Sequence, residues 1–259
     1  MCGWLLAFAV MLGASPVRAL AQTAAAAATP AESGAGEGAV LWRAGDLDGA
    51  RQRWEQELDQ DLQPGSELPA RERARLAYNV GVAHYTAGEP LRAAALFESA
   101  VQLAPRWDSA AANRDLARAD AGLDPKDRGI VGSFVHFFTR GEAEWLALLG
   151  GLLVLGAGLL DALRGGGWGR APWLAILALP VFWAPLVGHV VTGGGDAVMV
   201  VDPEGAALFG TPDAGAERLG KLNAGAESLV LDRLPGWVKV VDRGEERWAA
   251  ADSVLSLKR

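Results

Sequence analysis

Two long apolar runs, at residues 145–163 and 172–192, constrain this chain more than any other feature. Neither run has a polar face, and tryptophans stand near their ends, as in the aromatic belt of membrane spans. At 1.5 Å per residue the first run covers about 28 Å, close to the hydrocarbon thickness of a bilayer. The pattern predicts two transmembrane helices. A buried helical hairpin of a soluble domain is the alternative.

The loop between the two runs, residues 164–171, predicts on which side of the membrane the other parts lie. It carries Arg164 and Arg170 and no acidic residue, and such loops stay in the cytoplasm under the positive-inside rule. Residues 1–21 have the apolar stretch and the small-x-small ending of a secretory signal peptide. Both soluble parts are therefore expected outside the cytoplasm.

Charge and cysteine content exclude several classes of function. The formal charge of −7 and the pI near 5.1 argue against a nucleic-acid-binding protein, which needs a basic face. Cys2, within the predicted signal peptide, is the only cysteine. After cleavage the chain would have no disulfide, no catalytic thiol and no cysteine-ligated zinc.

Residues 22–39 form a spacer of small residues that is expected to be flexible. Residues 40–122, which follow it, are charged, alanine-rich and helically periodic. The best segment, 74–107, has the 34-residue length of a tetratricopeptide repeat. Its second helix has the small-large-small stripe of that family, and a degenerate copy lies at 31–64. The residues that carry the resemblance are Asn79, Val80, Gly81, Ala93, Phe97, Ala100 and Pro105. His84 departs from it, since an aromatic residue is usual there.

The resemblance to tetratricopeptide arrays implies a peptide-binding groove on the first helices of the repeats. By the family pattern, this groove would be formed by Arg75, Tyr78, Val82 and Tyr85. The alternative is that these side chains cover the insertion between the two repeats.

Residues 129–144 are expected to form an amphipathic segment in the lipid headgroup layer. Three phenylalanines share one helical face there. Thr139 is placed to cap a following helix whose first turn contains Glu142.

Residues 196–259 change to short alternating strands separated by Gly, Pro and Asp turn signals, which predicts a small all-β domain. The order of these signals resembles the bacterial SH3-like domain. Alternation places Val238 and Val240 in the core and Trp237 on the opposite face. Trp237 and Trp248 are candidates for a contact with a peptide or cell-wall material; ordinary barrel packing is the alternative.

No catalytic motif is visible in the sequence. The histidines lie in three different segments, and carboxylate pairs such as Asp59/Asp61 and Glu245/Glu246 stand in polar runs, where solvated surface is expected. We therefore expect no enzyme activity, no metal site and no cofactor.

The order of the parts predicts a multi-domain membrane protein: an all-α tetratricopeptide array, a transmembrane helical hairpin and a small all-β SH3-like barrel. This order resembles one component of the Bat (aerotolerance) systems of bacteria. The resemblance implies an inner-membrane adaptor with periplasmic interaction domains and with von Willebrand A and MoxR-type ATPase proteins as partners. A peptidoglycan-binding sensor or anchor is the alternative.

Overall fold

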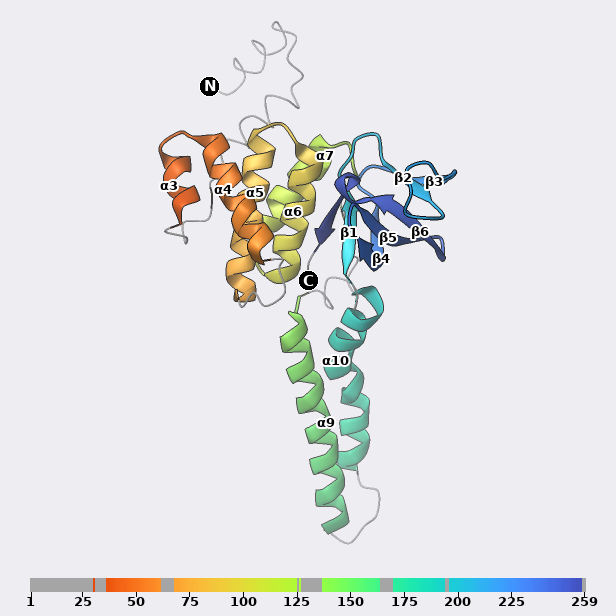
Figure 1. The fold of residues 1–259 in the computed structure, drawn as a ribbon. Coiled ribbons are helices and arrows are strands. Elements are labelled where there is room, and N and C mark those ends of the chain that lie inside the picture. Colours follow the sequence, from red (N-terminus) through yellow and green to blue (C-terminus); the bar gives the residue numbers. More distant parts are fainter. Residues whose placement is uncertain are drawn as a thin grey trace, which may run out of the picture. The chain divides into compact units, whose positions relative to one another are not determined.

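The computed structural model divides the chain into two compact units (Figure 1). Unit 1 joins residues 1–126 to residues 197–259, and unit 2 is the segment 127–196 between them. The structure describes residues 30, 36–61, 68–124, 126, 137–163, 170–193 and 196–257, with some side chains of 170–193 left out. The predicted signal peptide, most of the predicted spacer, half of the predicted headgroup segment (129–136) and residues 164–169 of the predicted loop lie outside these residues.

The described part of unit 1 begins with two helix–turn–helix pairs and one further helix. They are α3 (Glu37–Arg43), α4 (Leu47–Asp61), α5 (Ala70–Thr86), α6 (Pro90–Leu103) and α7 (Asp108–Asp120). Gly45 and Gly88, in the turns within the pairs, have φ of 83° and 80°, a region that glycine occupies without strain. The helix–turn–helix predicted over 74–107 is present. The predicted spacer extends too far, because α3 already starts at Glu37.

The packing of α5 against α6 confirms the stripe predicted on the second helix. Ala93, Phe97 and Ala100 are almost completely buried, with exposed fractions of 0%, 1% and 0%. Gly81 of α5 lies directly over the Phe97 ring, since a Cβ atom added at this glycine would be 2.9 Å from the ring carbons. A side chain at position 81 would therefore push the two helices apart.

The second part of unit 1 is an antiparallel sheet of seven described strands in the order β3-β2-β6-β5-β4-β1-β7. Alternate side chains of the strands form a separate cluster on one face of the sheet, which includes Val238 and Val240 of β5. The predicted alternation on this strand is thus confirmed. The strands are β1 (Ala197–Val200), β2 (Ala206–Phe209), β3 (Arg218–Leu222), β4 (Glu227–Leu234), β5 (Trp237–Asp242), β6 (Glu245–Ala250) and β7 (Val254–Leu257).

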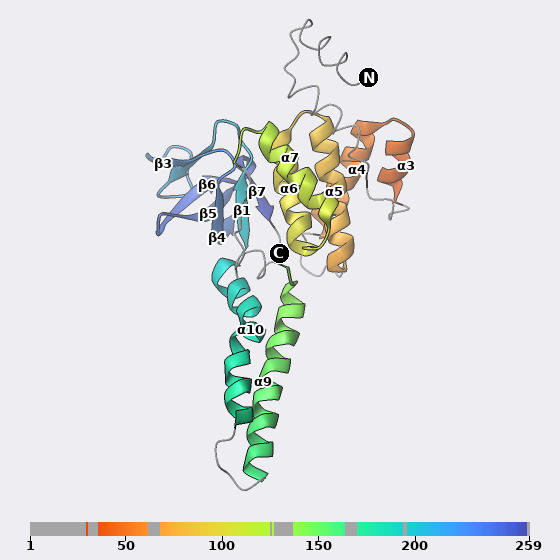
Figure 2. The same ribbon diagram turned by 180° about the vertical axis from the view of Figure 1, so that it is seen from behind.

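Strand β1 is buried on both faces, and this overturns the predicted fold class. Val198 and Val200 belong to the sheet's own cluster. Ala197 and Met199, which point the other way, belong to a cluster with side chains of the helices such as Phe97. The helices and the sheet therefore share one core, and Figures 1 and 2 show from opposite sides that the sheet lies beside the helices. The prediction of a separate tetratricopeptide array and a separate SH3-like barrel is wrong, because each would expose the face that the other covers.

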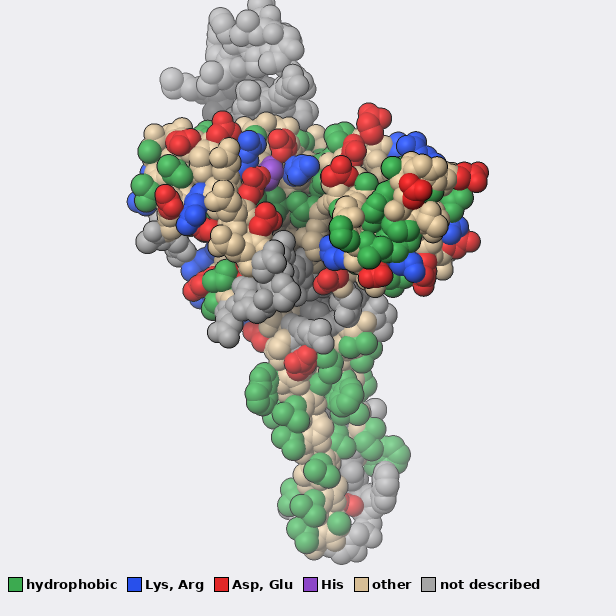
Figure 3. All heavy atoms as spheres, in the orientation of Figure 1, with side chains coloured by type: hydrophobic (Ala, Val, Ile, Leu, Met, Phe, Trp, Pro, Cys, Tyr) green, Lys and Arg blue, Asp and Glu red, His purple; other side chains and the backbone are tan. Residues whose placement is uncertain are grey.

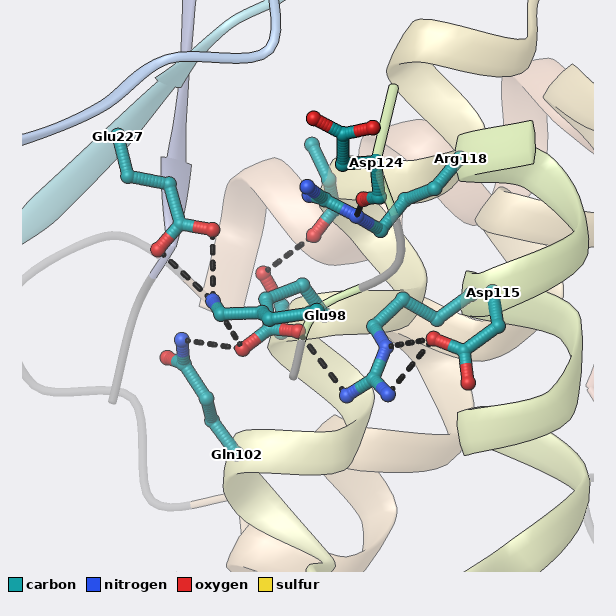
Figure 4. A network of polar contacts seen from close by, with 10 residues as sticks. Glu98, Gln102, Asp115, Arg118, Asp124 and Glu227 are labelled. Carbon is teal, nitrogen blue, oxygen red and sulfur yellow. Dashed lines mark hydrogen bonds and ion pairs between the residues drawn. The ribbon is translucent and has the colours of Figure 1, made fainter. Parts of the chain in front are cut away.

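A network of charged groups also joins the helices to the sheet (Figure 4). Glu98 of α6 is 1% exposed and lies 3.3 Å from Arg114 of α7 and 2.9 Å from Lys126. The Lys126 ammonium also contacts Glu227 of β4, at 2.6 Å. Because a buried carboxylate is costly unless it is paired, these cations compensate for the desolvation of Glu98.

Unit 2 contains α9 (Arg140–Leu163) and α10 (Arg170–Gly193). Thr139 caps α9 as predicted: its hydroxyl accepts from the Glu142 N–H at 3.3 Å, and the Glu142 carboxylate accepts from the Thr139 N–H at 2.9 Å. The two helices pack closely where Gly150 faces Phe182, since a Cβ atom at Gly150 would be 2.6 Å from that side chain.

The predicted pair of transmembrane helices is a second error in the fold class. Among the described residues, one helix, Gly141–Leu163, is long and apolar enough to cross a membrane. The apolar part of α10 that can be assessed is the shorter stretch Leu179–Gly188, well under the roughly 20 residues that a span needs. Pro180 and Pro185 lie inside that helix, where each removes a backbone hydrogen bond.

Candidate functional site

The predicted peptide groove on the first helices is closed in the structure. Tyr78, Val82 and Tyr85 are 4%, 0% and 8% exposed and belong to the core shared with the sheet. Tyr78 stacks on Trp107, with ring centroids 4.6 Å apart. The prediction that these residues form an open groove is wrong, because Trp107 and the α7 residues Asn113 and Asp120 cover the surface that an isolated array would expose. Arg75, the fourth residue of the predicted groove, is half-buried and lines a second pocket next to Trp54 of α4.

The two tyrosines report how far this core excludes water. Burial raises the pKa of both phenols above the ordinary 10.0. The Tyr85 hydroxyl also donates to Asp120, and this hydrogen bond together with the charge of Asp120 raises the pKa of Tyr85 further. For Tyr78, the hydrogen bond that its oxygen accepts from Asn113, at 2.8 Å, acts against burial and lowers the pKa.

An open pocket of about 340 Å³ lies instead where α4, α5 and α6 meet strand β7. We call it the α–β pocket. Its volume falls in the range of ligand-binding pockets, about 300–1,000 Å³. Figure 3 shows hydrophobic side chains set back behind charged ones between the helices and the sheet. Its apolar lining comes from Leu58, Ala77, Val80, Leu96, Leu103 and Leu255, and its polar lining from Glu55, Asp59, Asp61, Arg73, His84, Arg92, Ser99 and Ser256.

His84 connects two of the elements that surround the α–β pocket. Its Nε2 lies 3.0 Å from a carboxylate oxygen of Glu55 on α4, and its Nδ1 lies 2.7 Å from one of Glu89, which precedes α6. Arg51 and Arg92 approach the same Glu89 carboxylate at 3.7 and 4.0 Å. The departure from an aromatic residue at position 84 therefore places a polar bridge where the family pattern has an apolar contact.

A buried ion pair forms another part of the rim. Asp61, at the end of α4, is 2% exposed, and its carboxylate lies 2.7 Å from the Arg73 guanidinium of α5. The interpretation of Asp59/Asp61 as solvated surface is therefore wrong for Asp61, whereas Asp59 is exposed. The polar run around Asp61 gave no sign of this pairing, because its partner lies on the next helix.

The aromatic residues predicted on the β part lie on the sheet face opposite the valine cluster. Trp237 is half-buried and meets Phe209 edge to face, with ring centroids 5.5 Å apart. Trp248 is 8% exposed, and the Lys239 ammonium lies 5.8 Å from its ring centroid. Trp237 is thus the more accessible of the two predicted contacts, and Trp248 belongs mainly to the packing of the sheet.

The structure is thus of the class in which paired helices pack on an antiparallel sheet. Its open pocket has an apolar floor and a charged rim. No group of three or more His, Cys, Asp or Glu side chains that could hold a metal ion is found among the described residues. No family model, no curated protein and no solved structure matches this chain.

Proposed function

We propose that this protein is a non-catalytic adaptor that binds a segment of another protein in the α–β pocket. The observation that carries the proposal is the combination of an apolar floor with a rim on which Asp61 pairs with Arg73 and Glu55 contacts His84. Ion pairs such as Asp61–Arg73 hold the rim in place and leave the floor to bind apolar side chains. Such a pocket favours an uncharged, apolar segment over a charged ligand.

The pocket is tested with two arginine substitutions on the same helix. Leu58→Arg places a charge in the pocket, and Leu47→Arg places one on α4 outside its lining, where Leu47 is 45% exposed. Peptides selected from a phage-displayed library on the full-length protein are expected to bind the Leu47→Arg variant like the original and the Leu58→Arg variant at least tenfold more weakly. Equal binding to both variants, with thermal unfolding unchanged, would rule out this pocket.

Unit 2 is proposed to attach the adaptor to a membrane. Leucines of α9 such as Leu152, Leu155 and Leu159 are 56–69% exposed, and a bilayer would remove this apolar surface from water. The secretory signal predicted at 1–21 would place unit 1 on the outer side of that membrane, with partners among envelope proteins such as those of the Bat systems.

Membrane attachment is measured by co-flotation of the purified protein with phosphatidylethanolamine–phosphatidylglycerol vesicles. The double variant Leu155→Asp/Leu159→Asp is expected to stay at the bottom of the gradient, because each aspartate in a bilayer costs about 3 kcal/mol. Leu219→Asp on β3, where the leucine is 48% exposed, should float like the unmodified protein. Flotation of the double variant would contradict the proposed role of α9.

Peptidoglycan binding is the second candidate, and the half-buried Trp237 beside Phe209 is the observation that favours it. Aromatic rings offer an apolar face to a sugar or peptide. The test is cosedimentation of the full chain with purified sacculi, because the sheet shares its core with the helices and an excised β part would expose Ala197 and Met199. Pelleting that Trp237→Ala abolishes would favour the anchor over the adaptor.

A further inference from the structure

Strand β7 (Val254–Leu257) lies at one edge of the sheet, because among the described strands it pairs with β1 alone. An edge strand directs half of its backbone N–H and C=O groups away from the sheet, where they can pair with another extended chain. Native proteins usually cover or blunt such an edge. Here the edge borders the α–β pocket, because Leu255 and Ser256 both contribute to its lining.

The register of the β1–β7 ladder shows which backbone groups face outward. Val201 N–H donates to Ser253 C=O at 3.0 Å, and this contact continues the register in which Met199 faces Leu255. In an antiparallel ladder, bonded pairs alternate with non-bonded ones. Leu255 is thus bonded to β1, whereas the backbone N–H and C=O of Ser256 point to the free edge. Within the described part of the chain these two groups have no partner outside the ladder.

The pocket reaches two consecutive residues of the strand, Leu255 and Ser256. Consecutive side chains of a strand point to opposite faces: Leu255 packs with the helical clusters, whereas the Ser256 hydroxyl accepts from Arg233 at 3.0 Å. The pocket lining thus includes Ser256, whose backbone groups face the free edge, as well as Leu255. The wall opposite the edge is apolar, with Leu96 of α6 and Leu58 of α4.

We propose that the α–β pocket binds an extended segment of a partner protein, which adds to the sheet as a strand beside β7. Backbone bonds to Ser256 hold the segment, and one apolar side chain of the segment packs on Leu58, Val80 and Leu96. This inference rests on the proposed adaptor function and names its partner: a β-strand with an uncharged, apolar residue in the pocket. Hydrogen-bond complementarity selects an extended chain over a helix, whose backbone groups are already bonded within it.

The first test changes the edge and leaves the pocket floor as it is. Ser256→Pro removes the outward N–H, and a proline is tolerated on an edge strand where its nitrogen faces away from the ladder. Ser256→Ala is the matched control, because it removes the hydroxyl and keeps the N–H. Acetylated octapeptides that alternate threonine with valine, leucine or phenylalanine are titrated onto the full-length variants. Binding is expected to weaken about tenfold for Ser256→Pro and to stay within about twofold for Ser256→Ala.

The second test leaves the protein unchanged, so it holds even if Ser256→Pro does not fold. Each backbone nitrogen of the tightest octapeptide is methylated in turn. Strand addition predicts that affinity falls at every second position, since only those N–H groups face β7. The Ser256 amide should also exchange hydrogen more slowly when the octapeptide is bound.

The outcomes separate this inference from the proposed function. If octapeptide binding depends on Leu58 but shows no alternation along the peptide and no protection of Ser256, the adaptor stands and the strand addition is wrong. If none of the octapeptides binds although library peptides bind at Leu58, the segment is not an extended apolar chain and the inference is also wrong. Dimers of this chain that Ser256→Pro abolishes would show a second copy, rather than a partner, at the edge.

Discussion

Helices α6 and α9 are both rich in alanine and leucine, yet their side chains lie in opposite environments. On α6, Leu96 is 2% and Phe97 is 1% exposed, because α5, α7 and the sheet surround the helix. On α9, Leu155 is 69% and Leu163 is 74% exposed. The comparison teaches that an apolar helix predicts burial but not the medium that provides it. For α6 this medium is the rest of unit 1, and for α9 we propose a lipid bilayer.

The largest effect is expected from breaking the protein core around α6. Phe97→Ala should lower the free energy of unfolding by about 3–5 kcal/mol, because it leaves a cavity beside Gly81. Leu155→Ala on α9 should change it by less than about 0.5 kcal/mol, since no described part of the chain covers this side chain. Urea unfolding in detergent, followed by tryptophan fluorescence, measures both. Equal losses would mean that α9 is packed like α6.

The charged side of α6 gives the next largest effect. Glu98→Ala should cost about 3 kcal/mol of unfolding free energy, because Arg114, which is 6% exposed, loses a partner and the link from Lys126 to the helices is lost. Glu246→Ala, which breaks an exposed pair with Lys239, should cost less than about 1 kcal/mol. The same unfolding experiment compares them. A Glu98 variant as stable as the Glu246 variant would show that the network contributes no stability.

The two buried tyrosines beside α6 should make the stability of this core depend on pH. Both have pKa values raised by burial, so the unfolded chain releases these protons first as the pH passes 10. The stability is fully present below that pH and falls above it, by up to about 1.4 kcal/mol per pH unit for each tyrosine.

Absorbance at 295 nm measures this titration directly, because Tyr78 and Tyr85 are the only tyrosines. The folded protein should show no phenolate at pH 10, and the protein in urea should show about half of the full signal. Tyr85→Phe should reduce the loss of stability above pH 10. Phenolate absorbance of the folded protein at pH 10 would contradict the burial of this core.

The smallest effect concerns how the two helices begin. Helix α6 starts with Pro90 and has no side-chain cap, whereas α9 has the reciprocal Thr139–Glu142 cap. Thr139→Ala should destabilise the first turn of α9 by about 1 kcal/mol. Faster hydrogen exchange of amides 141–144 measures it, with Thr139→Ser as the control that keeps the cap. Unchanged exchange would mean that other contacts hold this turn.

Local patterns predicted the elements of unit 1 well, because each depends on neighbours in the sequence. The helix–turn–helix over 74–107, the stripe around Phe97 and the alternation of Val238 and Val240 all follow from helix and strand periodicity. The cap at Thr139 also follows from a spacing of three residues. The separation into independent domains failed, although β1 carried a signal: all four of its residues, Ala197–Val200, are apolar. A strand without a polar face must be covered on both sides.

The site could be predicted much less well than the elements. Tyr78, Val82 and Tyr85 were assigned to a groove from their positions on α5, but Trp107 and residues of α7 fill it. The α–β pocket was missed, because its lining joins the helices to β7, more than 150 residues further along the chain. His84 was the one visible signal, as a polar residue where the repeat pattern has an aromatic one.

The sequence by itself determined the helical pair over 74–107, the strand-forming character of 196–259 and which of their faces are apolar, because periodicity and turn residues act over a few neighbouring positions. Only the tertiary structure decided which apolar faces meet, and with them the shared core, the Glu98 network and the pocket. The contact between Lys126 and Glu227 spans 101 residues. Such contacts depend on how complete elements fit together in space, and no local spacing specifies that fit.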